Sequence, residues 1–565
     1  MTDKPRKATA SAQSMMRIFT VPEAPESTLS KIEHALSEDL AGFLTQSIVA
    51  LEKPLSEIEE DFQAYNIPAE PTFVSDYTEE MMQNLVAHSV HTAAPSFIGH
   101  MTSAMPYFVL PLSKVMVGLN QNLVKIETSK AFTPLERQVL GMMHHLVFGQ
   151  EHKFYQQWMH SANHSLGAFC SGGTVANITA LWIARNQLLH AEGEFPGVTS
   201  AGLTAALRHY GWQDLAILVS ERGHYSLGKA ADLLGIGRQN IVSIPTDADN
   251  KVDVAQMRAA AERLTAQGVR IMAIVGVAGT TETGNIDPLH QLADLAAEYQ
   301  CHFHVDAAWG GASLMSTKYR YLLDGIERAD SVTIDAHKQL YVPMGAGMVL
   351  FRDPKLARAI VHHAEYILRR GSKDLGSQTL EGSRPGMAML VHACLNIIGR
   401  HGYEILINRS LEKARFFAEL INHHPDFELI SAPELCLLTY RYVPQPVQLA
   451  LNEAVSSGAW DKVTLINGLL NDLTLVIQKN QREQGKSFVS RTRLQPARYQ
   501  RQTVTVFRVV LANPLTTEQI LRDVLVEEQQ LAEQQQAILQ QLQLAWPLRL
   551  SKHASIHTDI PLTPV

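Results

Sequence analysis

The sequence predicts an α/β protein built on a mostly parallel, seven-stranded sheet with helices on both faces. Between residues 167 and 351, short apolar runs alternate with stretches in which apolar residues recur at helical spacing. This alternation is typical of strand–helix–strand units, whose crossover helices cover the sheet. The runs are almost continuously apolar, as strands buried on both faces are. Glycine and polar residues follow several runs directly, at the edge where open α/β sheets bind ligands.

The predicted strands fall within one stretch of the chain, which we assign to a large domain over residues 134–384. This domain begins with a predicted helix over 134–148, and helical stretches such as AQMRAAAERLTAQG separate most of the strands. The predicted strands cover residues 167–170, 215–220, 240–245, 271–279, 302–308, 331–337 and 347–351.

The region before this domain is predicted to be helical. Residues 1–28 carry Lys, Ser, Thr and Pro without periodicity, and we expect them to be disordered. From residue 29 to residue 60, apolar residues recur at helical spacing. Such helices pack either on a partner subunit or on the core of their own chain. We therefore expect segment 29–133 to be a helical region that can form a dimer.

A smaller α+β domain is predicted for residues 385–565. Helical spacing extends from 385 to about 425, and two strand-like runs follow at 435–443 and 503–511. The glutamine-rich stretch 526–544 keeps leucine and isoleucine on one face. It is therefore predicted to be a closing helix and not a low-complexity tract.

The composition argues against several classes of function. A net charge of -8 provides no basic field for nucleic acid or an anionic membrane. No apolar run approaches the roughly 18 residues that a membrane span needs, and the N-terminus lacks the apolar core of a signal peptide. Four cysteines lie far apart without metal-binding spacing, which is typical of a reducing compartment. We expect a cytoplasmic protein that binds no metal.

Two predicted strands end in an acid and a lysine. The run FHVDAAWGG places Asp306 at one strand end, and SVTIDAHKQLYVP places His337 and Lys338 at the other. A lysine that can form a Schiff base, near an aspartate that can pair with a pyridinium nitrogen, is the arrangement of pyridoxal 5'-phosphate (PLP) sites. An ordinary ion pair at a sheet edge explains these residues equally well when they are taken alone.

Three further segments could complete a PLP site. The turn SGGT at 171–174 lies between a strand and a helix, where free backbone N–H groups, the helix dipole and the Thr174 hydroxyl can hold a phosphate. His224 follows a strand and could stack on a heteroaromatic ring, although a surface histidine is the commoner case. Thr280 and Thr281 could reach a bound cofactor or only cap their turn.

Taken together, the motifs resemble those of the group II PLP-dependent amino-acid decarboxylases. SGGTVAN, SERGHYS, GTTETGNID, HVDAAWGG and DAHK occur in that family's order and at about its separations, across roughly residues 90–525. The resemblance implies the type I, aspartate-aminotransferase-like fold, PLP as cofactor, and a homodimer with its sites at the interface. SFIGHMTS, ETSKAF and LEGSRPG are most similar to the bacterial members that decarboxylate aspartate to β-alanine for pantothenate synthesis.

The resemblance also implies a role for each matching residue. Lys338 would bind the cofactor covalently, and Asp306 would pair with its pyridinium nitrogen. Ala308 and His224 would lie on opposite faces of the ring, and His224 is also a candidate catalytic residue. The remaining cofactor contacts would come from Gly173, Thr174 and His337 at the phosphate and from Thr280 at the ring substituents.

Three residues match positions that bind substrate in the family. Arg508, in VFRVVLANP, stands where glutamate decarboxylases have the arginine that binds the retained carboxylate, for which bidentate pairing is suited. A structural ion pair on a strand is the alternative for Arg508. Asn122, in NQNLVKIET, matches an asparagine that contacts substrate. His100, in FIGHMTS, replaces a glutamine of glutamate decarboxylases, which indicates a substrate side chain of different length or charge.

The group that returns a proton to Cα is not identified by the resemblance. Family members carry a tyrosine for this step in a loop after the lysine strand, but the corresponding stretch 369–386 contains none. Tyr341, just after the lysine, and Tyr366, just before the loop, are the two alternatives.

These residues predict an α-decarboxylase of a small acidic amino acid, with L-aspartate as the first choice. Glutamate decarboxylation to γ-aminobutyrate is the alternative within the same chemistry, because one methylene changes binding by only about 1–3 kcal/mol. A PLP aminotransferase or desulfurase is a second class, which the match at Arg508 disfavours. A non-catalytic relative is a third class, which intact Lys338, Asp306 and His224 disfavour.

Overall fold

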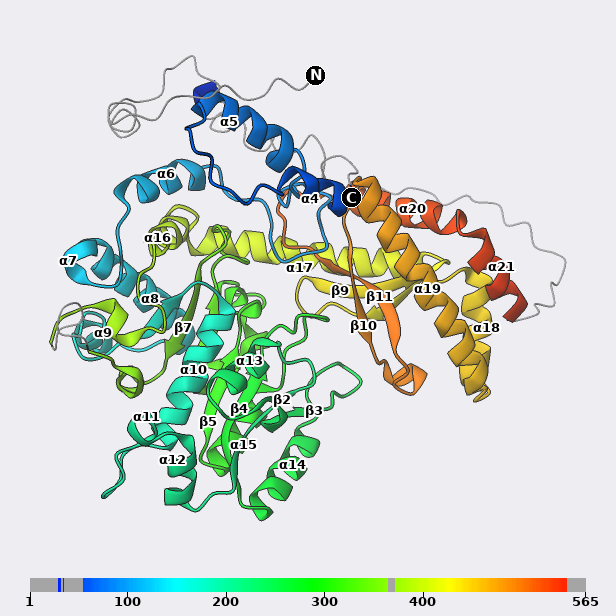
Figure 1. Cartoon of the computed structure of the whole chain (residues 1–565). Coiled ribbons are helices and arrows are strands. Elements are labelled where there is room, and N and C mark those ends of the chain that lie inside the picture. The colour runs from blue at the N-terminus through cyan, green and yellow to red at the C-terminus, as the bar shows by residue number, and fades with distance from the viewer. Residues whose placement is uncertain (1–28, 32–33, 35–53, 364–370, 546–565) are drawn as a thin grey trace.

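The computed structural model describes two sheets with their helices (Figure 1). The described residues are 29–31, 34, 54–363 and 371–545. The segment 1–28, predicted to be disordered, lies outside the described residues, as does most of the predicted helical stretch 29–60. The strand orders are β1-β7-β6-β5-β4-β2-β3 in the large sheet and β10-β11-β9-β8 in the small one.

The strands of the large sheet coincide with the seven predicted apolar runs. The pairs β3–β2, β2–β4, β4–β5 and β5–β6 are parallel, whereas β7 is antiparallel to both β1 and β6. The connection from β6 to β7 is short and contains no crossover helix, so the chain reverses direction there. The bounds are β1 Gly167–Cys170, β2 Asp214–Ser220, β3 Ile241–Ile244, β4 Val269–Val277, β5 His302–Asp306, β6 Ser331–Asp335 and β7 Gly347–Phe351.

Both faces of this sheet are buried. Along β2, Leu215, Ile217 and Val219 belong to one apolar cluster, whereas Ala216 and Leu218 belong to another. Successive side chains of a strand point to opposite faces, so each face has its own layer of helices. This layering explains why the strands are almost continuously apolar in the sequence. The helices are α8 Phe132–Phe148, α9 His152–Trp158, α10 Gly173–Leu188, α11 Val198–Ala201, α12 Leu203–Tyr210, α13 Ser226–Leu233, α14 Val254–Ala266 and α15 Leu289–Glu298.

The small sheet has four antiparallel strands, of which the sequence predicted two. Strands β9 (Leu437–Tyr442) and β11 (Val504–Val510) are the central pair and are fully buried. The two strands that were missed, β8 (Phe427–Ser431) and β10 (Ser490–Leu494), lie at the edges. In β10, Arg491 and Arg493 are exposed, so the strand lacks the apolar run by which the others were recognised.

Helices surround the small sheet and link it to the large one. Helix α17 packs against the large-domain 3-10 helix η3 (Gly310–Met315) as well as against β8 and β9. The closing helix predicted at 526–544 is instead two helices, which meet near Gln535. The bounds are α16 Ala388–Ile397, α17 Gly399–His423, α18 Gln445–Ser456, α19 Trp460–Gln484, α20 Glu518–Glu533 and α21 Gln536–Ala545.

The described N-terminal region contains several helices, as predicted, joined by irregular segments, and many of its apolar side chains are exposed. Tyr65 and Ile67 are 92% and 94% exposed, and Val117 is 68% exposed. No described helix of the chain has both the length and the apolar character that crossing a membrane requires. The elements are α4 Leu55–Asp61, α5 Val74–Met81 with the π-helical turn η1 Met82–Val86, α6 Val109–Leu119 and α7 Ile126–Ser129.

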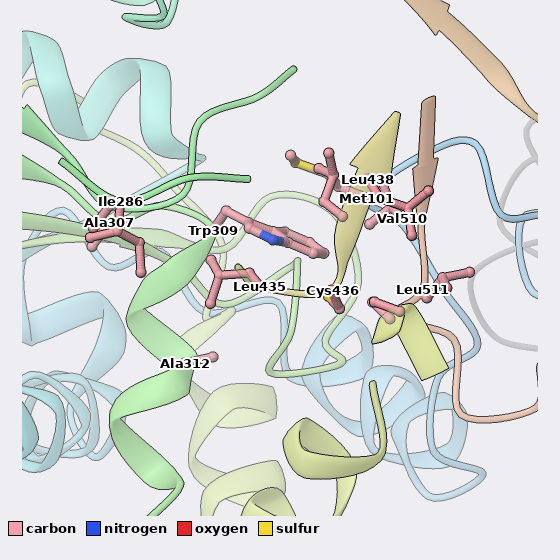
Figure 2. Packing of buried hydrophobic residues seen from close by; sticks show 14 of the residues in the cluster. Met101, Ile286, Ala307, Trp309, Ala312, Leu435, Cys436, Leu438, Val510 and Leu511 are labelled. Atoms are coloured by element: carbon pink, nitrogen blue, oxygen red, sulfur yellow. The ribbon is translucent and has the colours of Figure 1, made fainter. Parts of the chain in front are cut away.

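The large and small sheets share one apolar core. Trp309, just after β5, is 2% exposed and lies close to Leu435 from the start of the small sheet (Figure 2). Gly279 makes this approach possible, because a Cβ there would lie 3.1 Å from the Trp309 ring and 3.0 Å from the Gly310 nitrogen. Its φ of 101° is in the left-handed region that favours glycine.

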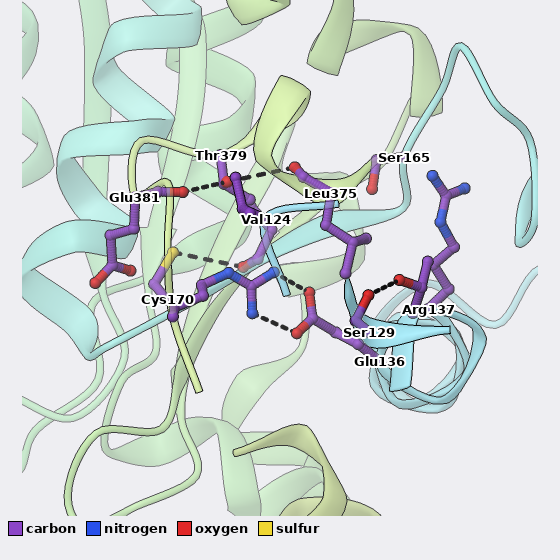
Figure 3. Close-up of polar contacts among 12 residues, drawn as sticks. Val124, Ser129, Glu136, Arg137, Ser165, Cys170, Leu375, Thr379 and Glu381 are labelled. Atoms are coloured by element: carbon purple, nitrogen blue, oxygen red, sulfur yellow. Dashed lines mark hydrogen bonds and ion pairs between the residues drawn. The ribbon is translucent and has the colours of Figure 1, made fainter. Parts of the chain in front are cut away.

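A buried ion pair fastens the segment 374–384 to helix α8. The Arg384 guanidinium makes two hydrogen bonds to the Glu136 carboxylate, and both side chains are almost completely buried (Figure 3). The Arg384 carbonyl accepts from the Leu123 N–H at 3.1 Å. This segment therefore lies against the end of the N-terminal region. In the same segment, three residues before Arg384, Glu381 accepts a hydrogen bond from the Ser171 N–H at 2.9 Å.

The buried imidazole of His144 predicts a loss of stability in acid. Its Nε2–H donates to the Phe351 carbonyl at 3.0 Å, Nδ1 lies 2.9 Å from the Tyr155 hydroxyl, and burial lowers its pKa to about 4. Below pH 6.5 the unfolded chain binds a proton at this position and the folded chain does not, so stability falls as pH decreases towards 4. The pKa difference corresponds to roughly 3 kcal/mol.

We therefore expect His144→Gln to remove part of the acid-dependent decrease in unfolding free energy, measured by urea titration at several pH values. The matched control is His145→Gln, because His145 is the exposed neighbour on the same helix. Identical pH profiles for the two variants would contradict this account.

Candidate active site

A cavity of about 520 Å³ lies at the carboxyl ends of the large-sheet strands. It has the position that the strand-end residues predicted. The cavity brings together all of the predicted site residues except Asn122 and Thr280. Those present are His100, Gly173, Thr174, His224, Asp306, Ala308, His337, Lys338 and Arg508.

The turn before α10 contains two glycines at positions where a side chain would come too close to neighbouring residues. A Cβ on Gly173 would lie 2.8 Å from Asp335 Oδ2, and one on Gly172 would lie 3.1 Å from the His337 ring. Both positions therefore depend on glycine. The free N–H groups at the start of the 16-residue helix α10, together with the Thr174 hydroxyl, suit a phosphate. The His337 Nδ1 is buried and has no hydrogen-bond partner among the described residues, so it is left for a ligand.

Lys338 contacts Asp335, an acid that was not predicted as a site residue. Its Nζ lies 3.2 Å from Asp335 Oδ2, while the other Asp335 oxygen is buried without a hydrogen-bond partner in the described chain. Asp335 is the last residue of β6 and Lys338 follows three residues later. The pair keeps the amine at the cavity edge. DAHK, read as one motif, contains both residues.

Asp306 ends β5 and is 6% exposed. Its Oδ2 accepts a hydrogen bond from the Asn177 amide at 2.8 Å, and its Oδ1 accepts from the Ala308 N–H at 3.2 Å. These two donors fix the orientation of the carboxylate at the cavity. Asn177 was not predicted as a site residue, although it is the last residue of the quoted motif SGGTVAN.

His224 lines the cavity with a defined tautomer. Its Nδ1 lies 2.8 Å from the Ser226 hydroxyl and 3.3 Å from the Ser226 N–H. Because the backbone N–H can only donate, Nδ1 accepts and the proton lies on Nε2. Burial lowers the pKa of His224, as does the charge of Lys338, while Asp306 acts in the opposite direction. The neutral ring suits stacking on a bound heteroaromatic group.

Arg508 reaches the cavity from the small sheet and is held by three oxygens. Its Nε donates to the Thr281 carbonyl at 2.6 Å, and its Nη1 donates to the Gly99 carbonyl at 3.2 Å and to the Ser490 hydroxyl at 3.3 Å. Burial lowers its pKa to about 10, so it remains a cation at neutral pH. The donors of Nε and Nη1 are used by these contacts, and only Nη2 is left for a ligand.

His100 lies in the same part of the cavity as Arg508. Its Nδ1 accepts from the Thr102 N–H at 3.3 Å, so its proton lies on Nε2. Burial lowers the pKa of His100, and the positive charges of Arg508 and Lys338 lower it further. A neutral imidazole with a free N–H is therefore placed beside the guanidinium.

Two predicted contacts are not made within this chain. The Thr280 hydroxyl lies 2.8 Å from the Thr283 hydroxyl and accepts from the Asn285 N–H, so it stabilises its turn, and Thr281 lines the cavity instead. Asn122 donates to the Ser383 hydroxyl at 2.9 Å, outside the cavity. The turn-capping alternative for Thr280 is the one that the geometry favours.

Of the two tyrosines considered for the proton transfer, the structure describes Tyr341, which does not line this cavity. The Tyr341 hydroxyl donates to the Ala512 carbonyl at 3.1 Å, and burial raises its pKa. Tyr366 lies outside the described residues. Among the residues that the structure describes, no group of His, Cys, Asp or Glu side chains is arranged to hold a metal ion.

Comparison with known proteins identifies the family. A family model described as the pyridoxal-dependent decarboxylase conserved domain matches residues 55–443. The chain belongs to the pyridoxal-dependent decarboxylases. Aspartate 1-decarboxylase of Aliivibrio fischeri is 64% identical over 527 residues, which cover 93% of this chain and 96% of that protein. An acidic amino acid decarboxylase of Xenopus tropicalis is 30% identical over 372 residues, or 65% of this chain and 68% of its own.

The fold of this decarboxylase is shared with solved structures. The crystal structure of mouse CSAD has a TM-score of 0.74 to this chain, covers 89% of it and 98% of its own chain, and is 24% identical. This likeness confirms the predicted fold class.

The cavity fits PLP, the cofactor of the family. The glycine cradle before α10 and the unpartnered His337 Nδ1 would hold the phosphate. Asp306, held in place by the Asn177 amide, would pair with the ring nitrogen, and Lys338 would supply the amine. When bound, PLP supplies a protonated ring that accepts the electron pair of a breaking Cα bond.

Lys338→Ala is expected to abolish covalent PLP attachment and turnover, because no other lysine lines the cavity within the described chain. The measurements are the absorbance of the bound cofactor and the release of carbon dioxide. Lys229→Ala is the control: its ammonium lies 4.8 Å from the Tyr225 ring, near the cavity but not in it. Full activity in Lys338→Ala would show that the site is assigned wrongly.

Proposed function

We propose that this decarboxylase removes the α-carboxyl group of L-aspartate and so produces β-alanine and carbon dioxide. The observation that carries the proposal is the buried Arg508 cation with its unused Nη2, placed in the same cavity as Lys338. The 64% identity to the Aliivibrio fischeri aspartate 1-decarboxylase supports aspartate as the substrate. We further propose that the β-alanine serves pantothenate synthesis and that the protein is cytoplasmic.

The charges in the cavity favour an acidic side chain. Arg508 is 8% exposed, so a carboxylate that meets it is removed from water and gains a strong charge-assisted contact. The neutral His100 beside it can donate a hydrogen bond through its Nε2–H. Burial raises the pKa of the nearby Glu282, whereas the charges of Arg222 and Arg508 act in the opposite direction. An apolar or basic side chain would leave the Arg508 charge unpaired.

The residues of the large sheet would prepare the reacting bond. Asp306 would pair with the ring nitrogen, and His224 and Ala308 would hold the ring between them. A side-chain carboxylate held by Arg508 would help to orient the substrate for the reaction. Asp335, whose Oδ2 lies 3.2 Å from the Lys338 Nζ, would position the lysine side chain.

An end-point screen of acidic amino acids with added PLP tests the substrate. We expect aspartate to give β-alanine, identified by mass, faster than glutamate gives γ-aminobutyrate. Discrimination of about 10- to 200-fold is what one methylene allows. In Arg508→Gln, kcat/KM for aspartate should fall by roughly ten- to a hundredfold while PLP binding is kept, because one charged hydrogen bond is lost.

The matched control is Arg493→Gln, which alters an exposed arginine on the neighbouring strand β10. Preferred turnover of glutamate would replace the aspartate proposal by its alternative. Equal loss of PLP binding and turnover in Arg508→Gln would make Arg508 structural.

We also propose that the protein is a homodimer whose sites lie at the subunit interface. Among the residues that the structure describes, the N-terminal helices and the segments between them expose apolar side chains, and a second copy would cover them. Asn122, which does not reach the cavity of its own chain, lies beside Ser383 in the same region. The exposed side chains are Leu55, Phe62, Tyr65, Ile67, Tyr77, Tyr107, Val115 and Val117.

Val117→Glu is expected to convert a dimer into a less active monomer, because a charge would be buried in the proposed contact. Light scattering should give twice the 62.6 kDa chain mass for the wild type and the single mass for the variant. Leu233→Glu is the control, since Leu233 is 71% exposed on α13, away from the N-terminal helices. A fully active wild-type monomer would contradict the proposal.

A further inference from the structure

A chain of buried polar side chains extends behind Asp306, away from the cavity. The His302 Nε2 lies 2.7 Å from the Ser331 hydroxyl, which lies 2.8 Å from His304 Nδ1. His304 Nε2 lies 3.0 Å from the Asn177 carbonyl oxygen, and the Asn177 amide donates to Asp306 at 2.8 Å. His304 and Ser331 are 0% and 1% exposed. We name Asn177, His304 and Ser331 the Asp306 relay.

The direction of every hydrogen bond in the relay follows from one fact. An ionised carboxylate can only accept, so Asp306 fixes the Asn177 amide group towards itself and the Asn177 oxygen towards His304. That oxygen requires a proton on His304 Nε2, so His304 Nδ1 accepts from the Ser331 hydroxyl. The relay is therefore oriented as a whole, with each donor pointing towards Asp306.

A branch of the relay reaches the other side of the cofactor site. The second N–H of the Asn177 amide donates to the Ser226 hydroxyl at 3.0 Å, and that hydroxyl donates to His224 Nδ1 at 2.8 Å. Ser226 is 0% exposed. The Asn177 amide group thus contacts Asp306 directly and, through Ser226, determines which nitrogen of His224 carries the proton. Asp306 lies where the ring nitrogen is expected, and His224 lies where a ring face is expected.

We propose that Asn177 and His304 are positioning residues that hold Asp306 and His224 in the geometry needed by the cofactor ring. His304 acts only through Asn177: its N–H keeps the amide from turning its oxygen towards Asp306, where two acceptors would repel. Burial keeps His304 neutral and lowers its pKa to about 4, which secures the single N–H that the relay needs. The proposal does not depend on which acidic amino acid is the substrate.

A purely structural role for the same bonds makes a different prediction. Buried polar groups are nearly always paired, and removing a partner destabilises the fold wherever it occurs. A positioning role must also change the bound cofactor. The readouts are therefore the rate of PLP release from the holoenzyme without substrate, the absorbance of bound PLP, kcat and KM, and the thermal midpoint of the apoenzyme.

We expect His304→Leu to release PLP about tenfold faster or more and to lower kcat by a similar factor, because Asp306 loses its fixed donor. KM for the amino acid should change much less, since Arg508 is untouched. His304→Gln, whose amide can again donate to Asn177, should restore most of the slow release. His144→Leu is the matched control, because His144 is equally buried but lies in α8, where it bonds Tyr155 and Phe351.

The two explanations then separate clearly. If His304→Leu and His144→Leu lower the thermal midpoint alike and both keep wild-type PLP release and absorbance, the relay is only structural and the proposal is overturned. Should His304→Leu fail to fold, Asn177→Leu removes the donor nearest Asp306 with little change in side-chain volume. Wild-type PLP release in Asn177→Leu would overturn the proposal equally.

Discussion

The site depends on holding a carboxylate in one orientation where it is almost cut off from water. Asp306 is 6% exposed, and a buried polar group without hydrogen-bond partners would destabilise the fold. The Asn177 amide and the Ala308 N–H supply the donors, and a protonated ring nitrogen would supply the opposite charge. A parallel sheet suits this requirement, because strand β5 ends at Asp306 and its carboxylate points from a rigid edge.

The remaining parts of the cavity are placed by the same sheet. Strands β5 and β6 are parallel neighbours, so their ends bring Asp306 and the Asp335–Lys338 pair to one edge. Strand β7 lies on the other side of β6, and the glycine turn that follows β1 comes close to it. A Cβ on Gly347 in β7 would lie 2.5 Å from Asp335 Oδ1 and 2.6 Å from Gly172 Cα. Glycines in the turn after β1 and at the start of β7 thus let this turn and Asp335 approach β7 closely.

The sequence predicted the large sheet and nine of the residues that line the cavity, because both are recognisable from local patterns. Apolar runs indicate the strands of the large sheet. The missed strands β8 and β10 are short edge strands, and β10 has exposed arginines in place of an apolar run. A sequence motif also cannot show which of two consecutive threonines faces the cavity. Thr280 was predicted to contact the cofactor, whereas Thr281 lines the cavity. His304 did carry a signal: it precedes Asp306 by two residues and so points to the same face of β5.

Arg508 shows how surrounding contacts limit the geometry available to a predicted binding residue. From the sequence, Arg508 was expected to bind a carboxylate by bidentate pairing. In the structure, the donors on Nε and Nη1 are committed to Thr281, Gly99 and Ser490, which come from three separate segments. Within the described chain, neither edge of the guanidinium therefore has two nitrogens with unused N–H groups. If Arg508 binds a carboxylate as we propose, the contact would be end-on through Nη2. Because the three protein contacts hold the guanidinium in place, the length of a ligand's side chain would then decide whether its carboxylate reaches that nitrogen.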